Sequence, residues 1–165
     1  MSDLIELEVF NVTVDPTQQL PIVLLRAKED EDWFLPIWIG AWEANAIAMR
    51  LQGITPPRPM TYELFTNVLS LLGGKLEKVV INDIRGETFY AQLHLNHGGT
   101  THVVDSRPSD AINLALRLGA PIYASRHVME SSGFTRPKED EEKKKLREWL
   151  ESIKPEDFGR DAPKE

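Results

Sequence analysis

Short runs of alternating apolar and polar residues recur along the chain, and each run ends at a turn signal. This period of two is typical of β-strands that bury one face. The first three runs cover residues 4–14, 20–27 and 33–39. Only the turn Asp15-Pro16 and the charged run 28–32 separate them, so they are predicted to form an antiparallel meander. The apolar face of the first run changes at Val9-Phe10, which predicts a β-bulge or a strong twist.

Helical patterns of period 3.6 alternate with further strands. The predicted helices cover residues 41–51, 61–72 and 109–118, with a helical turn at 127–132, and the further strands cover 75–84, 87–95, 101–107 and 121–125. Thr61 and Ser109 are placed to cap the second and third helices. The second helix is predicted to be buried through Leu64, Phe65, Val68, Leu69 and Leu72. These patterns predict an α+β or mixed α/β fold, in which an antiparallel-rich mixed sheet of about six to seven strands packs with three main helices.

The composition changes after Gly133. Residues 1–135 are predicted to form one domain, and residues 136–165 a charged C-terminal helix with a tail that is disordered from residue 155 onward. The helix is expected over about residues 137–153 and has one narrow apolar stripe, which either docks on the domain or meets a partner chain. The stripe consists of Leu146, Trp149, Leu150 and Ile153.

The composition excludes several kinds of site and partner. The chain has no cysteine, which excludes disulfides, thiolate metal sites and cysteine nucleophiles. Its net charge of −7 argues against coating nucleic acid with surplus Lys and Arg, but allows a local basic patch or an acidic metal pocket. No apolar run approaches the ~20 residues that span a bilayer, and the N-terminal segment is unlike a secretory signal. A cytoplasmic protein without a membrane partner is therefore expected. Motifs for phosphate loops, dinucleotides, zinc proteases and serine hydrolases are absent from the sequence, and no organic cofactor is expected.

A strand end runs directly into a helix start at residues 105–112. On the strand, Asp105 and Arg107 project from the same face. On the helix, Asp110, Asn113 and Arg117 share a face through their i, i+3, i+7 spacing. Hydrolysis of a phosphodiester needs such groups, because carboxylates can hold a divalent metal and arginine offsets charge on the phosphoryl oxygens.

A purely structural explanation of the same residues stays open. Ser109 and Asp110 are what a helix start favours, since an acid there interacts with the helix dipole by ~0.3–1 kcal/mol. Asp105 and Arg107 would then form a local ion pair. Glu63 is likewise explained as an acid in the first turn of the second helix.

Several motifs resemble the bifunctional nuclease family in order and spacing, over roughly residues 5–130. They are LPIWIG at residues 35–40 followed by Glu43-Ala44, RPMT at 58–61, GETFYA at 86–91, DSRPSDAI at 105–112 and API at 120–122. The resemblance implies an α/β domain that forms homo-oligomers, with dimers favoured. It also implies an ability to cut both DNA and RNA, with nucleic acid as a transient substrate. The C-terminal residues 136–165 lie outside the resemblance.

The candidate site joins the junction at residues 105–112 to the first two helices. The candidate catalytic residues are Asp105, Arg107, Asp110, Glu43 and Glu63. The candidate ligand-binding residues are Arg58, Ser109 and Arg117, and the candidate ligands of Mg²⁺ or Mn²⁺ are Asp105 and Asp110. Four of these residues lie on the most recognisable motif of the family, and Glu43 lies on the next.

The chain departs from the family pattern at Thr61-Tyr62-Glu63, where members commonly have Thr-His-Asp. Glu63 can replace a carboxylate, but Tyr62 cannot replace a histidine as a base near neutral pH, because the usual pKa of tyrosine is ~10. Two hypotheses follow. The chain is a low-specificity nuclease that uses a metal-bound water, or it is a non-catalytic oligomeric module that binds a small anionic ligand or a protein partner.

Overall fold

A single eight-stranded sheet forms the centre of the computed structural model, which describes residues 3–137 and 141–152. The spatial order of the strands is β6-β5-β4-β7-β1-β2-β3-β8. The strands are β1 (Leu4–Val14), β2 (Pro21–Ala27), β3 (Trp33–Trp38), β4 (Gly74–Arg85), β5 (Thr88–His97), β6 (Thr100–Ser106), β7 (Ile122–Ser125) and β8 (Phe134–Thr135). The predicted α+β class with a mixed, mostly antiparallel sheet is confirmed.

Two local antiparallel meanders make up the sheet, and β7 joins them. β1, β2 and β3 form the first meander as predicted, and β4, β5 and β6 form the second. β7 lies between the meanders, antiparallel to β1 and parallel to β4. The register of β1 against β2 shifts between Val9 and Asn11, which confirms the predicted bulge. The two-residue strand β8 was not predicted, because so short a segment has no readable period.

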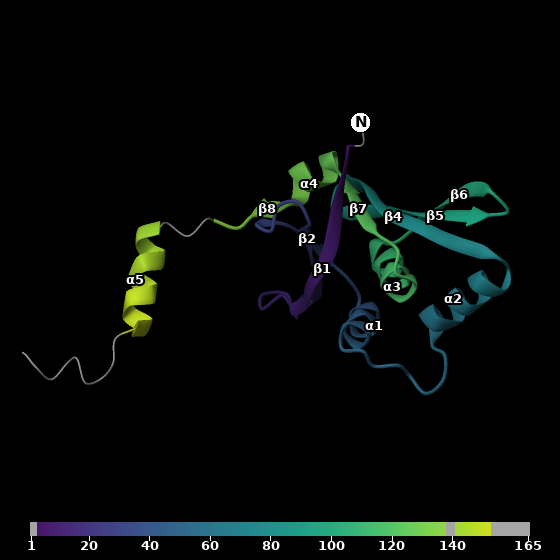
Figure 1. The fold of residues 1–165 in the computed structure, drawn as a ribbon, viewed down its shortest axis with the longest axis horizontal. Helices are drawn as coiled ribbons and strands as arrows, with labels where there is room; N and C mark the ends of the chain where they lie inside the picture. Colours follow the sequence, from purple (N-terminus) through teal and green to yellow (C-terminus); the bar gives the residue numbers. More distant parts are fainter. Residues whose placement is uncertain (1–2, 138–140, 153–165) are drawn as a thin grey trace, which may run out of the picture.

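Three helices of equal length lie together on one side of the sheet, drawn below it in Figure 1. They are α1 (Ala41–Leu51), α2 (Thr61–Leu71) and α3 (Pro108–Leu118). α3 lies between the other two and contacts both, together with β4 and β5. The short helix α4 (Arg126–Ser132) follows β7, and α5 (Glu141–Ser152) lies apart from the sheet in Figure 1.

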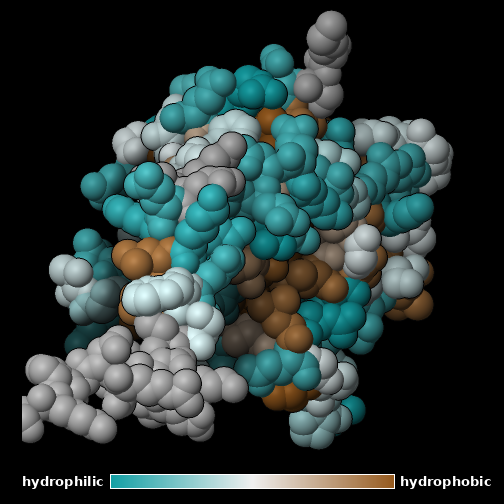
Figure 2. Space-filling view, turned by 60° about the vertical axis from the view of Figure 1, so that its left-hand side comes forward, coloured by the Kyte–Doolittle hydropathy of each residue, from teal (hydrophilic) through white to brown (hydrophobic). Residues whose placement is uncertain are grey.

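The hydrophobic core lies between the sheet and the helical layer. Aliphatic side chains of the central strands pack there against the buried faces of α1 and α3, as the alternating patterns require. Ile47 of α1 and Ile112 of α3 are fully buried in it. Other apolar side chains remain at the surface, and Figure 2 shows a group of them below the centre of one face, between hydrophilic regions. The core therefore fixes α1 and α3, the two helices that carry most of the candidate site.

The starts of two helices differ from the prediction. The cap position of α3 is Arg107, and Ser109 is already its second helical residue, because Pro108 occupies the first turn, where its fixed φ angle is favoured. The cap position of α2 is Met60, and Thr61 is its first helical residue. In the described part of the chain, the side chain of neither cap residue accepts a hydrogen bond from a backbone N–H of its helix. The predicted capping by Ser109 and Thr61 is wrong, because neither residue occupies the cap position.

The predicted burial of the second helix is also wrong. None of the eleven residues of α2, all of them described, is buried. The helix touches α3 and β4, and its outward side lies at the margin of the helical layer, where no further described element covers it. Its apolar residues Leu64, Phe65, Val68 and Leu71 are consequently exposed.

The C-terminal helix begins later than expected, at Glu141. Its stripe residues Leu146, Trp149 and Leu150 are exposed in the structure, while Ile153 and the tail predicted to be disordered lie outside the described residues. Before this helix, Arg136 forms an ion pair with Asp32, which ties residues 134–136 to the first meander. Within the described residues, no helix is both long and apolar enough to cross a membrane.

Candidate functional site

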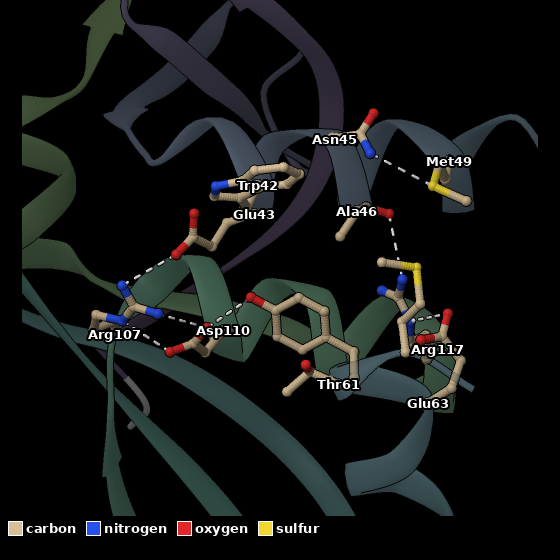
Figure 3. A pocket seen from close by; sticks show the side chains of 12 residues that line it. Trp42, Glu43, Asn45, Ala46, Met49, Thr61, Glu63, Arg107, Asp110 and Arg117 are labelled. Atoms are coloured by element: carbon tan, nitrogen blue, oxygen red, sulfur yellow. Dashed lines mark hydrogen bonds and ion pairs between the residues drawn. The ribbon is translucent and has the colours of Figure 1, made fainter. Parts of the chain in front are cut away.

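A cavity of about 300 Å³ opens between α1, α2 and α3, and we call it the Arg107 pocket. Its charged side chains lie at two ends, as Figure 3 shows: Arg107 and Asp110 at one end, Arg117 and Glu63 at the other. The apolar part of the wall comes from Trp42, Ala46, Met49 and Met60. Residues far apart in the sequence therefore meet in one pocket, because α3 packs between α1 and α2.

Arg107 links two carboxylates from different helices. Its Nε donates to Oδ2 of Asp110 at 2.9 Å, and its Nη2 donates to Oδ1 of the same residue at 3.1 Å. Its Nη1 lies 3.2 Å from Oε1 of Glu43 on α1. The hydrogen bonds to Asp110 raise the pKa of Arg107, so the guanidinium stays charged. Although it is held on two sides, 67% of the Arg107 side chain is exposed, which leaves it open to a ligand.

Tyr62 holds Asp110 from the side of α2. Its hydroxyl donates to Oδ1 of Asp110 at 2.7 Å. Burial of the ring raises the pKa of Tyr62 far above its usual value, and the hydrogen bond to Asp110 and the negative charges of Asp110 and Glu43 raise it further. Tyr62 is therefore a hydrogen-bond donor at every physiological pH. A phenol held in this protonated state cannot act as the base.

The second end of the pocket is a nearly buried ion pair. Nε of Arg117 donates to Oε1 of Glu63 at 3.2 Å, and only 9% of the Arg117 side chain is exposed. The same guanidinium donates to the carbonyl of Ala46 at 3.4 Å and lies 5.2 Å from the centre of the Tyr62 ring. Oε2 of Glu63 is buried without a hydrogen-bond partner in the described chain. The contacts at this end join α1, α2 and α3. They leave Oε2 of Glu63 without a described hydrogen bond that would offset the cost of burying it.

Asn113 is the polar residue that sequence reasoning placed on the right helix face without giving it a role. It is fully buried, and its Nδ2 donates to the carbonyl of Glu43 at 3.2 Å and to that of Ser109 at 2.9 Å. Its Oδ1 accepts from Nη1 of Arg117 at 3.0 Å. Asn113 therefore fixes the spacing of α1 and α3. A lone polar residue within an apolar helix stripe is the signal that marks such a residue in a sequence.

Gly40 is a second residue that the sequence did not single out. It precedes α1 with an ordinary φ of −72°, so its backbone conformation does not require glycine. A Cβ atom at this position would collide with the carboxylate of Glu43. The absence of a side chain at Gly40 thus makes room for Glu43 to reach Arg107, and the sequence signal is a glycine three residues before an acid at a helix start.

Asp105 lies in a neighbouring cavity of about 560 Å³, which we call the Asp105 hollow. It is exposed at the end of β6, and Arg107 and Asp110 line the same hollow. No described hydrogen bond or ion pair joins Asp105 to Arg107, whose partners are Glu43 and Asp110. The local ion pair that the structural explanation required is therefore not formed.

Two further candidates lie away from the Arg107 pocket. Arg58 is exposed on the proline-rich loop and lines none of the main cavities of the described chain. Ser109 is almost fully buried and borders a shallow surface next to Trp38 and Phe89. The structure thus brings Glu43, Glu63, Arg107, Asp110 and Arg117 together, places Asp105 beside them, and leaves Arg58 and Ser109 outside.

The carboxylates of the pocket do not form a fitting set of metal ligands. Both oxygens of Asp110 accept hydrogen bonds, and one oxygen of Glu43 is paired with Arg107. Among the described residues, no group of three or more His, Asp or Glu side chains could hold a metal ion. The binding of Mg²⁺ or Mn²⁺ by Asp105 and Asp110 stays a prediction from the sequence.

The fold and the motif at the start of α3 define a known domain class, and comparisons with other proteins agree. Residues 23–137 match the family model of the bifunctional nuclease domain, and the chain belongs to this family. An uncharacterised protein of Mycobacterium tuberculosis is 39% identical over 163 residues, which cover 93% of this chain and 97% of that protein.

Two relatives from plants have names that state an activity. Bifunctional nuclease 1 of Oryza sativa subsp. indica is 28% identical over 115 residues, or 68% of this chain and 35% of that protein. Bifunctional nuclease 1 of Arabidopsis thaliana is 27% identical over 117 residues, or 69% of this chain and 36% of that protein. The domain is thus shared with proteins that are about three times longer than the matched region.

Proposed function

We propose that this chain is a nuclease of low sequence specificity that hydrolyses phosphodiester bonds of DNA and RNA in the Arg107 pocket. The observation that carries the proposal is the guanidinium of Arg107, which two carboxylates orient while most of it stays open to solvent. An oriented and accessible guanidinium suits phosphoryl oxygens, which it binds through paired hydrogen bonds. Membership of the family and the names of the plant relatives support the same chemistry.

In the proposed reaction, Arg107 binds the two non-bridging oxygens of the phosphodiester. Some of its hydrogen bonds to Glu43 and Asp110 are replaced by hydrogen bonds to these oxygens. The guanidinium then stabilises the charge that develops on the oxygens in the transition state. Asp110 is a positioning residue, because its two oxygens fix the plane of the guanidinium. Tyr62 is a positioning residue for Asp110.

Glu43 is the proposed general base. Both oxygens of Asp110 are hydrogen-bonded, whereas Oε2 of Glu43 has no described hydrogen-bond partner and can accept a proton from water. The water oxygen forms a new bond to phosphorus while the bond to the leaving sugar oxygen breaks. The water proton passes to Glu43, and the leaving oxygen takes its proton from solvent.

The test uses the purified full chain and labelled single-stranded DNA and RNA oligonucleotides. We expect cleavage of both, a loss of about 10²–10⁴-fold in kcat for Glu43→Gln, which removes the base, and a loss of about 10–100-fold in kcat/KM for Arg107→Lys, which removes the paired donors. Glu130→Gln on α4 makes the same substitution at an exposed acid that does not line the pocket, and it serves as the control. Equal activity in all four preparations would indicate a contaminating nuclease and contradict the proposal.

The same cleavage assay, run once with EDTA and once with Mg²⁺ or Mn²⁺, tests the prediction that Asp105 and Asp110 bind a divalent metal ion. Activity that needs the cation and is lost in Asp105→Asn would support Asp105 as a metal ligand. Activity that persists in EDTA and in Asp105→Asn would contradict it and leave the reaction to Glu43 and Arg107.

One observation favours a second function, the non-catalytic binding of a small anion. Tyr62 stays protonated, and together with Arg107 and Arg117 it gives the pocket hydrogen-bond donors without a histidine base. Thermal unfolding in the presence of nucleotides separates the two functions. A rise in Tm that Arg107→Lys abolishes, without turnover of any oligonucleotide, would favour the binding module.

A further inference from the structure

The shallow surface next to Trp38 and Phe89 is the beginning of a longer groove, which we call the Trp38 groove. The surface continues into a cavity of about 480 Å³. Residues that line both parts are Leu20, Trp38, Glu87 and Phe89. At its other end the groove reaches Arg107, which among the described residues is the only one that lines both this groove and the Arg107 pocket. The proposed phosphate site therefore opens on two separate spaces.

Three of the sequence motifs meet in the Trp38 groove. LPIWIG contributes Trp38 at the end of β3, and DSRPSDAI contributes Arg107. GETFYA, which has no part in the Arg107 pocket, contributes Glu87 and Phe89 around the start of β5. Four other strands lie between β3 and β5 in the order of the sheet, so the sheet must curve for these two strands to border one groove.

Trp38 presents a fixed aromatic surface in this groove. Its Nε1 donates a hydrogen bond to Oδ2 of Asp15 at 3.2 Å, and 47% of the residue remains exposed. The backbone N–H of Thr17 donates to Oδ1 of the same carboxylate, which lowers the pKa of Asp15 and favours its ionised form. An indole that is oriented through its N–H and otherwise open suits the stacking of a flat ring, because little side-chain freedom is lost on binding.

The charges along the groove indicate which part of a nucleotide it can hold. Arg107 is the only Lys or Arg among the described residues that line the groove, so a single phosphate group meets a cation there. Glu87 is exposed, makes no described hydrogen bond or ion pair, and repels any further phosphate. Its carboxylate can instead accept hydrogen bonds from the N–H groups on the edge of a base. A base next to one phosphate therefore fits, and a run of backbone phosphates does not.

We propose that the Trp38 groove binds one nucleobase of a strand whose phosphodiester lies at Arg107, with the base stacked on the indole of Trp38. A phosphodiester joins two nucleotides, so the other nucleotide continues towards the Arg107 pocket. The inference rests on the proposed function, because it takes Arg107 as the phosphate site. It adds the substrate class, single-stranded nucleic acid, since a base within a duplex is not free to leave its stack. Stacking accepts every base, which agrees with low sequence specificity.

The first experiment follows the indole N–H resonances of the ¹⁵N-labelled full chain, which has four tryptophans. The probes are the 5′- and 3′-monophosphates of deoxyadenosine and base-free deoxyribose 5-phosphate, and Trp38→Phe identifies the Trp38 resonance. We expect at least one deoxyadenosine monophosphate to shift this resonance and to bind about 5–100-fold more tightly than deoxyribose 5-phosphate. If neither of them shifts the Trp38 resonance, or if the base adds no affinity, the proposal is overturned.

The second experiment compares two exposed tryptophans. Trp38→Ala should remove the gain in affinity that the base provides and leave the affinity for deoxyribose 5-phosphate unchanged. Trp149→Ala, at a residue of α5 that is 59% exposed and does not line the groove, should alter neither affinity. Arg107→Lys should weaken the binding of all three probes, because each carries a phosphate. In the cleavage assay, Trp38→Ala should raise KM for single-stranded DNA by about 5–100-fold, with a smaller effect on kcat.

The base site and the nuclease function fail in different ways. The probes contain no phosphodiester, so their binding is measured whether or not the chain cleaves oligonucleotides. Binding at Trp38 without cleavage of any oligonucleotide would contradict the nuclease function and support the base site. Cleavage with an unchanged KM in Trp38→Ala would support the nuclease function and overturn the base site. The comparison of probes uses the natural chain, so it decides the question even if Trp38→Ala does not fold.

Discussion

α2 and α3 are helices of the same length that differ in how far the fold buries them. Each has eleven residues, but seven residues of α3 are buried and none of α2 is. The difference does not follow from hydrophobicity, because α2 contains Leu64, Phe65, Val68 and Leu69 and is the more apolar of the two. It follows from position: α3 lies between two helices over β4 and β5, and α2 lies at the margin of the layer. An apolar stripe predicts that a helix face will be covered, but not that its own chain covers it.

The largest expected effect contrasts one core residue of α3 with one surface residue of α2. Ile112→Ala removes a fully buried side chain and should lower the free energy of unfolding by about 2–5 kcal/mol. Leu71→Ala should change that free energy by less than about 0.5 kcal/mol in dilute, monomeric protein. Urea unfolding followed by fluorescence measures both, and similar losses for the two variants would contradict the contrast.

Two asparagines, buried Asn113 of α3 and exposed Asn67 of α2, extend the comparison of the two helices to polar side chains. Asn113→Ala breaks the bonds that hold α1, α3 and Arg117 together and should cost about 1–3 kcal/mol of stability. Asn67→Ala on exposed α2 should be neutral or slightly stabilising, because alanine is the better helix former. An Asn113→Ala variant as stable as the natural chain would show that α1 and α3 are spaced by apolar packing alone.

Tyr62 is one of two residues of α2, with Glu63, whose polar groups contact α3, and its effect should depend on pH. Because burial raises the folded pKa of Tyr62 above its ordinary value of 10.0, folding favours the protonated phenol. The stabilisation is present in full below the unfolded pKa, and it is lost as pH rises from there towards the folded pKa. Tyr62→Phe should lose about 1 kcal/mol at pH 8 through the missing hydrogen bond. It should also show a smaller fall in stability above pH 10.0 than the natural chain.

The smallest effect on stability is expected at Gly40, where function and folding should separate. Gly40→Ala displaces the Glu43 carboxylate, which is the mobile end of a side chain, so the free energy of unfolding should fall by less than about 1 kcal/mol. Under the proposed function, kcat should fall by about tenfold or more. In a double-mutant cycle, adding Gly40→Ala to Glu43→Gln should then cause little further loss of activity. Additive losses would mean that Gly40 acts through another group.

The parts of the fold that the sequence predicts are those that local patterns determine. The bulge at Val9 could be predicted because the apolar face of one strand changes sides, and the bounds of α1 because Gly40 interrupts the strand before it. The contact between Tyr62 and Asp110 could not be predicted, because 48 residues separate them and their approach depends on how α2 packs on α3. In the same way, Glu43 and Arg107 were both candidates, but their pairing required the helical layer.

The position of β7 has a consequence for how the chain reaches this fold. Each meander is made of neighbouring strands and can assemble from contacts that are short in sequence. The two meanders become one sheet only when β7, at residues 122–125, inserts between β1 and β4. During synthesis this strand leaves the ribosome after both meanders have emerged. Joining the halves is therefore the late step of folding, and until it occurs β1 and β4 both present open edges that favour misassembly with other chains.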